Sequence, residues 1–212
     1  AIILTLIFMP DMNLSNAIWQ GLAHSISAFN GSGFIFFDNE GLLGGYENNS
    51  KILTTIGSGL FLGSIGYLVF LDFVQSFRWQ RFSLNSKIVI SSTLFLNMIG
   101  TIVFFMLESQ SGNGVLNELS SVDSAKHSLF NSLSGRTAGF SSLPFNLINS
   151  STVIWCSALM FIGGASASTA GGIKVNTFMV IFAFVKSTLS GSHNTSIFGR
   201  EIPDDQVKRC IT

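Results

Sequence analysis

Long apolar stretches separated by short polar ones organise the sequence. Residues 52–77 contain a single charge, Asp72, and residues 87–107 are interrupted mainly by Asn97. Each stretch is long enough to cross the roughly 30 Å hydrocarbon core of a bilayer. Residues 1–9 are apolar but too short to do so, and we interpret them as the end of a helix that starts before this sequence. The pattern predicts an all-α transmembrane fold.

Two shorter segments, residues 16–29 and residues 124–134, have mixed polarity and are too short to span a bilayer. Each leads into a turn that contains glycine, and these two glycine turns are residues 30–34 and residues 135–140. Polar side chains just before the short segments are expected to cap them as helices: Ser15 or Asn16 for the first, and Asp123 for the second. We predict that both are pore helices, which enter the membrane and return.

The order of these segments repeats along the chain. Residues 1–82 and residues 83–190 each contain a spanning helix, a short helix, a glycine turn and a second spanning stretch, and residues 191–212 form a polar linker. Identity between the two copies is slight, so the evidence for a repeat is the pattern. Internal repeats of this kind are typical of transport proteins.

The last apolar stretch, residues 150–188, is interrupted at residues 163–173 by small residues rich in glycine. Glycine costs a helix interior about 1 kcal/mol relative to alanine, so this run is a poor helix. Inside a bilayer its backbone would need protein or a water-filled cavity around it. On the residues alone, tight packing against a neighbouring helix explains the run equally well. A phosphate-binding loop is disfavoured because Gly172 is followed by Ile173 and not by lysine.

Composition and charge agree with a membrane protein. Of the 212 residues, 47% are apolar and only 10% are charged, whereas soluble domains carry about 25% charged residues. The net charge is zero, and no basic stripe is present to bind nucleic acid. Cys156 and Cys210 belong to no metal-binding motif. Most basic residues flank loops that we therefore expect in the cytoplasm: Arg78, Arg81, Lys87, Lys186, Arg200, Lys208 and Arg209.

With this orientation, both short helices enter the membrane from the outside. The C-terminus of such a helix carries about half a negative charge, which favours a cation. Carbonyl oxygens of an extended turn can replace the water around that ion. The residues by themselves therefore predict re-entrant loops that favour cations.

Three motifs resemble the Trk/Ktr/HKT superfamily of potassium transporters, in particular the bacterial Trk and Ktr membrane subunits. They are SAFNGSGF at residues 27–34, SGRTAGF at residues 134–140 and MFIGGASASTAGGIKV at residues 160–175, and FGREIPDD at residues 198–205 is similar to the linker of that family. The resemblance implies four helix–pore loop–helix repeats around one pore. This chain would be an internal fragment with the second and third repeats, and the third would have its second helix broken by an intramembrane loop.

The resemblance also implies roles for particular residues. The selectivity filter would be formed by Asn30, Gly31, Ser32 and Gly33 in one repeat and by Arg136, Thr137, Ala138 and Gly139 in the other. K⁺ would be bound by the backbone carbonyls of Gly31, Ser32, Gly33, Thr137, Ala138 and Gly139. The gating loop would be formed by Gly163, Gly164, Ala165, Ser166, Ala167, Ser168, Thr169, Ala170, Gly171, Gly172 and Lys174. Ala165-Ser166-Ala167 departs from the Ser-Pro-Gly expected there, and Gly31-Ser32 departs from the common Asn-Ala.

Several of these polar residues also have structural interpretations. Arg136 is a cation beside a cation path, and we expect it to be tied to carbonyls or to an acid behind the filter. Lys174 is either a cation of the gate or a lysine that reaches toward the membrane surface. His24 and His127 are expected to form structural hydrogen bonds.

The resemblance implies a multi-pass protein of the cell (inner) membrane that transports K⁺ or Na⁺, has no cofactor and is not an enzyme. Its expected partners are the lipid bilayer, a second copy in a homodimer, and a cytoplasmic regulatory subunit that binds a nucleotide. A serine protease of the rhomboid type is disfavoured because neither Ser32-Gly33 nor Ser134-Gly135 fits the Gly-x-Ser-Gly motif. A non-transporting scaffold or degenerate half-transporter remains an alternative.

Overall fold

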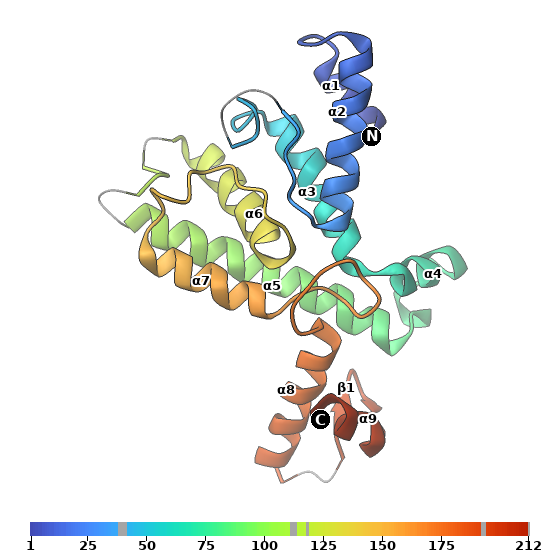
Figure 1. Cartoon of the computed structure of the whole chain (residues 1–212). Coiled ribbons are helices and arrows are strands. Elements are labelled where there is room, and N and C mark those ends of the chain that lie inside the picture. Colours follow the sequence, from blue (N-terminus) through green and yellow to red (C-terminus); the bar gives the residue numbers. More distant parts are fainter. Residues whose placement is uncertain (38–41, 111–113, 118, 192–193, 212) are drawn as a thin grey trace.

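The computed structural model describes residues 1–37, 42–110, 114–117, 119–191 and 194–211. Helices dominate this part of the chain, and one short hairpin lies near the C-terminus (Figure 1). The elements are α1 (Ile2–Phe8), α2 (Leu14–Asn30), α3 (Ser50–Ile65), α4 (Tyr67–Gln75), the 3₁₀ helix η1 (Trp79–Arg81), α5 (Leu84–Gln110), α6 (Ser121–Thr137), α7 (Ser150–Phe161), α8 (Val175–Leu189), β1 (Ser196–Ile197), β2 (Arg200–Glu201) and α9 (Asp204–Ile211).

Small residues allow the helices of the first copy to approach closely. α2 packs between α1 and α3 (Figure 1). A Cβ atom on Gly21 of α2 would lie 2.3 Å from Oγ1 of Thr5, and one on Gly63 of α3 would lie 1.9 Å from the carbonyl oxygen of Phe29. Real Cβ contacts are never this short, so both positions require glycine.

In the second copy, α6 lies against α5, α7 and α3 (Figure 1). α5 is long and apolar enough to cross a membrane by itself, and α3 with α4 passes the same test only if the two are counted as one bent span. At the other end of the molecule, α8 packs against β1 and α9.

Gly66 changes the expected shape of the first copy. The prediction of one continuous span at residues 52–77 is wrong, because α3 and α4 meet at an angle of 89° there. Gly66 has φ 83° and ψ 153°, a conformation that few other residues adopt. The chain therefore turns by nearly a right angle at Gly66, where the sequence predicted the interior of a helix.

Both short helices begin before the positions that their sequences indicated. Asn13 is the N-cap of α2 and Ser120 is the N-cap of α6, so the predicted caps Ser15 or Asn16 and Asp123 are wrong. The Ser120 hydroxyl accepts a hydrogen bond from the Asp123 amide and donates one to its carboxylate. This exchange closes the first turn of α6.

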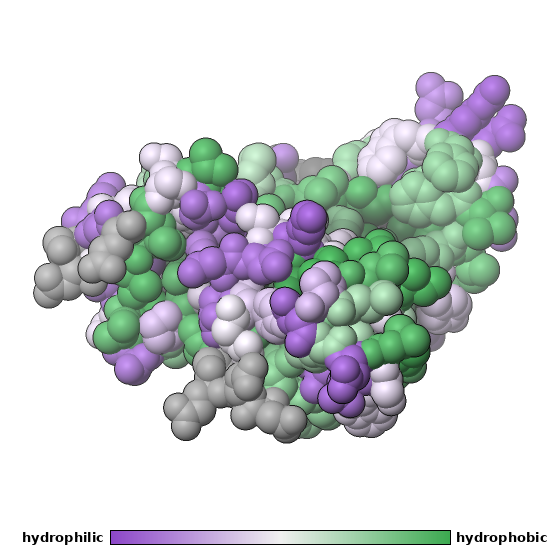
Figure 2. Space-filling model, turned by 90° about the horizontal axis from the view of Figure 1, so that it is seen from above, coloured by the Kyte–Doolittle hydropathy of each residue, from purple (hydrophilic) through white to green (hydrophobic). Residues whose placement is uncertain are grey.

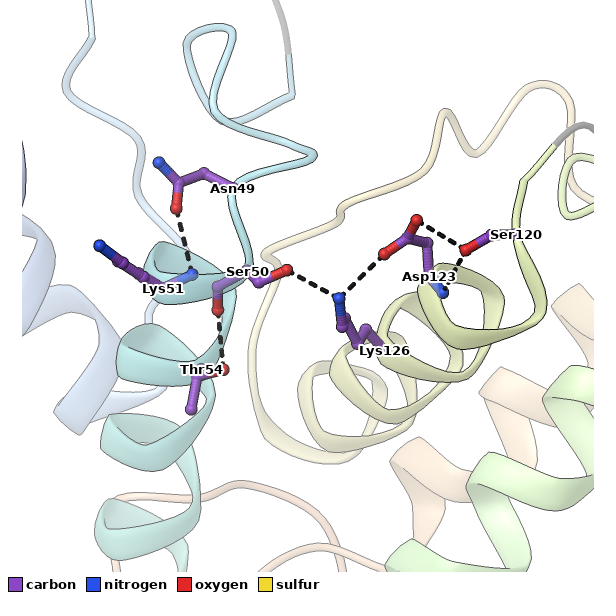
Figure 3. Close-up of polar contacts among 7 residues, drawn as sticks. All are labelled: Asn49, Ser50, Lys51, Thr54, Ser120, Asp123 and Lys126. Atoms are coloured by element: carbon purple, nitrogen blue, oxygen red, sulfur yellow. Dashed lines mark hydrogen bonds and ion pairs between the residues drawn. The ribbon is translucent and has the colours of Figure 1, made fainter.

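A polar bridge joins the N-terminal ends of α3 and α6, one from each copy (Figure 3). The Lys126 ammonium on α6 lies 2.9 Å from Oδ1 of Asp123 and 3.0 Å from Oγ of Ser50, at the start of α3. Hydrogen bonds from Lys126 and Ser120 hold the pKa of Asp123 below its ordinary value. The bridge is exposed, so we expect it to contribute little to stability.

Much of the surface is apolar. Exposed large hydrophobic side chains include Val74, which is 86% exposed, and Phe77, which is 88% exposed. Figure 2 shows hydrophobic surface next to hydrophilic patches on the upper face. Extensive exposed apolar surface marks a protein or membrane contact, and its wide distribution here fits a lipid environment.

The close approach of α2 and α3 predicts different effects for two glycines of the same helix. Gly63→Ala should destabilise the protein by about 1–3 kcal/mol, because the new methyl group would collide with the backbone of Phe29. Gly57→Ala is the matched control, since its Cβ would make only ordinary contacts of 3.6 Å and 3.7 Å with Leu133 and Phe130. Thermal unfolding in detergent measures both variants. Equal melting temperatures would show that the helices are not this close.

Candidate functional site

The glycine turns that follow α2 and α6 meet. After α2 the chain takes left-handed conformations at Gly31 (φ 63°) and Gly33 (φ 72°). A Cβ atom on Gly33 would lie 2.4 Å from the backbone nitrogen of Gly139. The structure therefore brings together Gly33 and Gly139, one from each glycine turn.

The helices extend further into the glycine turns than their sequences indicated. Asn30 is the last residue of α2, and α6 continues through Arg136 to Thr137. The Asn30 side chain donates back to the carbonyl of Ile26 on its own helix. Ala138, directly after α6, has an extended backbone (φ −140°, ψ 164°). The carbonyl groups in the last helical turn of α2 and of α6 lack partners within the helix, and they lie next to the glycine turn that follows.

Arg136 is buried behind the second glycine turn, with 3% of its surface exposed. Its Nη1 donates to Oδ1 of Asn97 on α5 (3.2 Å), and its Nη2 donates to the carbonyl of Gly163 (2.8 Å). The expectation that Arg136 is tied to carbonyls is confirmed. The second residue after α7 is therefore bonded directly to the last turn of α6.

The small-residue run between α7 and α8 forms a closed loop, here called the glycine loop (residues 163–173). The amide of Gly163 donates to the carbonyl of Ile173, and the amide of Ile173 donates to the carbonyl of Phe161, each at 3.0 Å. A Cβ atom on Gly163 would lie only 1.6 Å from the carbonyl oxygen of Gly171. Glycine is thus required where the two ends of the loop cross.

The glycine loop pairs with the backbone groups that the bend at Gly66 leaves open. The Ala165 amide donates to the carbonyl of Ser64 (2.9 Å), and the Tyr67 amide donates to the carbonyl of Ala167 (3.4 Å). Without the bend, groups of this kind would bond within one helix. Backbone groups at the break in the first copy therefore form hydrogen bonds with backbone groups at the break in the second copy.

Thr169 adds a side-chain contact to the same interface. Its hydroxyl lies 3.0 Å from the carbonyl oxygen of Phe29, in the last turn of α2, and 3.3 Å from that of Gly63 on α3. Both carbonyls are at helix ends, where intrahelical partners are missing. The loop is thereby bonded to α2 as well as to α6. Lys174 donates from Nζ to the carbonyl of Ala170, so its ammonium group folds back over the loop itself.

The glycine turns and the glycine loop line one cavity of about 310 Å³. Its lining residues are Gly31, Gly135, Arg136, Ala138, Gly139, Met160, Gly171 and Gly172. Residues predicted for the filter and residues predicted for the gate thus share a single space. The sequence did not point to Met160, Asn97 or Gly66, because their roles depend on partners from the other segments.

Comparison with known proteins gives consistent matches along nearly the whole chain. A family model described as TrkH, a cation transport protein, matches residues 4–211. The Ktr system potassium uptake protein B of Bacillus subtilis is 38% identical over 202 residues, which are 95% of this chain and 45% of that protein. The potassium/sodium uptake protein NtpJ of Enterococcus hirae is 27% identical over 100% of this chain and 46% of that protein.

The fold is also found in a solved structure. The crystal structure of the potassium transporter TrkH from Vibrio parahaemolyticus superposes with a TM-score of 0.74 at 19% identity, covering 98% of this chain and 45% of that one. The two chains therefore share a fold over this region. The chain spans about half the length of the relatives it matches.

Ala167 provides a test of the loop geometry, because its φ of 61° is left-handed. The family resemblance leads us to expect glycine at this position. The left-handed conformation costs a residue other than glycine about 1 kcal/mol, which offsets the entropy that glycine loses on folding. Ala167→Gly should therefore change stability by less than about 1 kcal/mol. Ala125→Gly, on the exposed face of α6, should lose about 1 kcal/mol. If thermal unfolding gives equal losses for both, Ala167 is not left-handed.

Proposed function

Since the TrkH cation transport family model matches residues 4–211, this chain belongs to that family, and we propose that it forms part of the pore of a K⁺ uptake system. Its relatives are named as potassium or potassium/sodium uptake proteins. The observation that carries the proposal is the shared cavity, because it brings the ends of both pore helices together with the glycine loop.

K⁺ would pass the glycine turns by exchanging water for backbone carbonyls. The proposed ligands are the carbonyls of Gly31, Ser32, Gly33, Thr137, Ala138 and Gly139. Two features support this assignment: the turns touch at Gly33 and Gly139, and the C-terminal ends of α2 and α6 point their negative dipole ends at them. Asn30 and Arg136 would act from the helix ends, and Arg136 would hold the surrounding structure. A carbonyl path of this kind suits a monovalent cation that must be released quickly.

The glycine loop would be the gate below this filter. Its side chains are small, it contacts the same cavity, and hydrogen bonds rather than large apolar side chains hold it to α2, α3 and α6. By the positive-inside rule, the glycine loop would lie on the cytoplasmic side of the filter.

The chain would act within a multi-pass, homodimeric membrane subunit built from pore repeats, and a cytoplasmic nucleotide-binding subunit would regulate it. The basic residues near the cytoplasmic loops support such a docking surface. Lys208 and Arg209 lie in the last turn of α9, which packs on α8 directly after the glycine loop. A partner that binds there could pull on the loop through α8.

Growth of a bacterial strain without K⁺ uptake systems tests the proposed function. Expression of the complete gene should restore growth at limiting K⁺, and the purified product should conduct K⁺ in liposomes. A protein that inserts in the membrane but supports neither growth nor flux would contradict the proposal and favour the non-transporting scaffold.

Loss of the Thr169 hydroxyl should weaken the closed state of the gate. Thr169→Val keeps the size of the side chain but removes the hydrogen bonds to Phe29 and Gly63, so the maximal rate of K⁺ uptake should rise by about threefold to tenfold. Thr188→Val is the matched control, because that hydroxyl bonds only to the carbonyl of Phe184 in its own helix. Initial rates of K⁺ or Rb⁺ uptake measure the effect. An unchanged rate in Thr169→Val would show that the loop is held by other contacts.

A further inference from the structure

On each pore helix, a buried serine forms a hydrogen bond to the chain just after the glycine turn. On α2, the Ser27 hydroxyl donates to the carbonyl of Phe34 (3.0 Å). On α6, the Ser134 hydroxyl donates to the carbonyl of Phe140 (2.5 Å). Ser27 is 4% exposed and Ser134 is 1% exposed. In both copies the accepting carbonyl belongs to the phenylalanine that directly follows the filter glycine.

A second contact follows further along each turn. In the first copy the peptide of Phe36 is bracketed, because Gln20 donates to its carbonyl (2.8 Å) and Nε2 of His24 accepts from its amide (3.3 Å). The acceptor role requires the His24 proton to lie on Nδ1, where it bonds the carbonyl of Gln20. The expectation that His24 forms structural hydrogen bonds is confirmed.

In the second copy the corresponding residue is Ser142. Its hydroxyl lies 2.8 Å from Nδ1 of His127 and 2.9 Å from Nδ2 of Asn131, and its amide donates to Oδ1 of Asn131 (3.3 Å). His127 thus also forms structural hydrogen bonds, as expected. Phe36 and Ser142 occupy the same offset from Gly33 and Gly139.

The two copies therefore build the same device from different residues. Each uses a serine near the end of the helix, and a histidine with an amide side chain one helical turn apart. In one copy the amide precedes the histidine, and in the other it follows. The residue types differ between the copies, but similar contacts recur. The feature that the copies share is therefore that the chain after the glycine is held against the preceding helix.

The serine contacts fix the directions of the carbonyls around the glycine. The Ser134 hydroxyl lies 3.2 Å from the carbonyl oxygen of Ala138 in addition to its shorter contact with Phe140. In an extended chain, carbonyls two residues apart face the same side and the one between them faces the other. Ala138 and Phe140 thus face the helix, and Gly139 faces away from it. Since a hydroxyl has one proton, it donates to only one of these two carbonyls, and the shorter contact is with Phe140.

We propose that Ser27 and Ser134 are positioning residues for ion selectivity: by holding the carbonyls of Phe34 and Phe140 against the pore helices, they keep the neighbouring filter carbonyls at a spacing that fits dehydrated K⁺ and not Na⁺. This inference rests on the proposed function. Neither hydroxyl contacts the ion itself. Their effect is on the geometry of Gly33 and Gly139.

The test compares K⁺ and Na⁺ transport by serine variants of the full-length protein. Ser27→Ala and Ser134→Ala should each lower the ratio of K⁺ to Na⁺ transport efficiency by about threefold to tenfold, the factor expected for one hydrogen bond. Ser25→Ala on α2 and Ser128→Ala on α6 are matched controls, because their hydroxyls bond only to carbonyls of their own helices. The controls should keep the parental ratio.

A purely structural role would lower the amount of folded protein and leave the ion ratio unchanged, and that result would overturn the inference while the proposed function stands. Where an alanine variant does not fold, Ser27→Cys and Ser134→Cys keep the side-chain size with a much weaker donor. A second readout is the melting temperature in KCl against NaCl, since a selective site is stabilised more by its own ion. Loss of that difference in the serine variants supports the inference. A parent protein that transports neither ion would overturn the proposed function and the inference together.

Discussion

Backbone pairing at two broken helices is the constraint on which the rest of the structure depends. A membrane offers no water to an open amide or carbonyl, so a break in a helix must find its partners in protein or in a wet cavity. Here the bend at Gly66 and the glycine loop supply each other, through the bonds from Ala165 to Ser64 and from Tyr67 to Ala167. Each break thus provides hydrogen-bond partners for backbone groups that the other leaves without a helical partner.

This pairing also places the C-terminal ends of α2 and α6. Thr169 can reach Phe29 only because Gly63 has no side chain, which lets the end of α2 lie directly on α3. On the opposite side, Arg136 bonds the start of the loop to α6. The loop is therefore fastened to both helices that carry the glycine turns. A movement of the loop would break these hydrogen bonds, each with a net value of about 1 kcal/mol, and would displace Ala165, which is fully buried against Ile65 and Val175.

The sequence predicts the elements well and their bends poorly. The order of helices, the approximate position of the loop and the tie of Arg136 to a carbonyl follow from hydrophobic periodicity and from the cost of a buried cation. The angle at Gly66 does not, because a glycine in an apolar run usually indicates close packing, and only the distant loop residues make a bend favourable there. The caps at Asn13 and Ser120 were missed by a few residues, since several polar side chains in a row could each end the helix. The contacts of Ser27 and Ser134 were not predicted, because α2 and α6 each contain several serines and the sequence does not distinguish these two.

The two sides of the cavity are held by different kinds of groups. Around the glycine turns, buried hydroxyl, amide and imidazole groups from α2 and α6 hold the backbone at several points, and a buried polar group resists displacement because its partners cannot be replaced by water. The glycine loop is held mainly through its own backbone, which bonds to Ser64, Tyr67 and Arg136, and through the Thr169 hydroxyl; Ala167 within it is left-handed. One cavity is thus bordered by a side held through buried side chains and a side held mainly through its own backbone. Under the proposed function, the first side would set ion selectivity and the second would act as the gate.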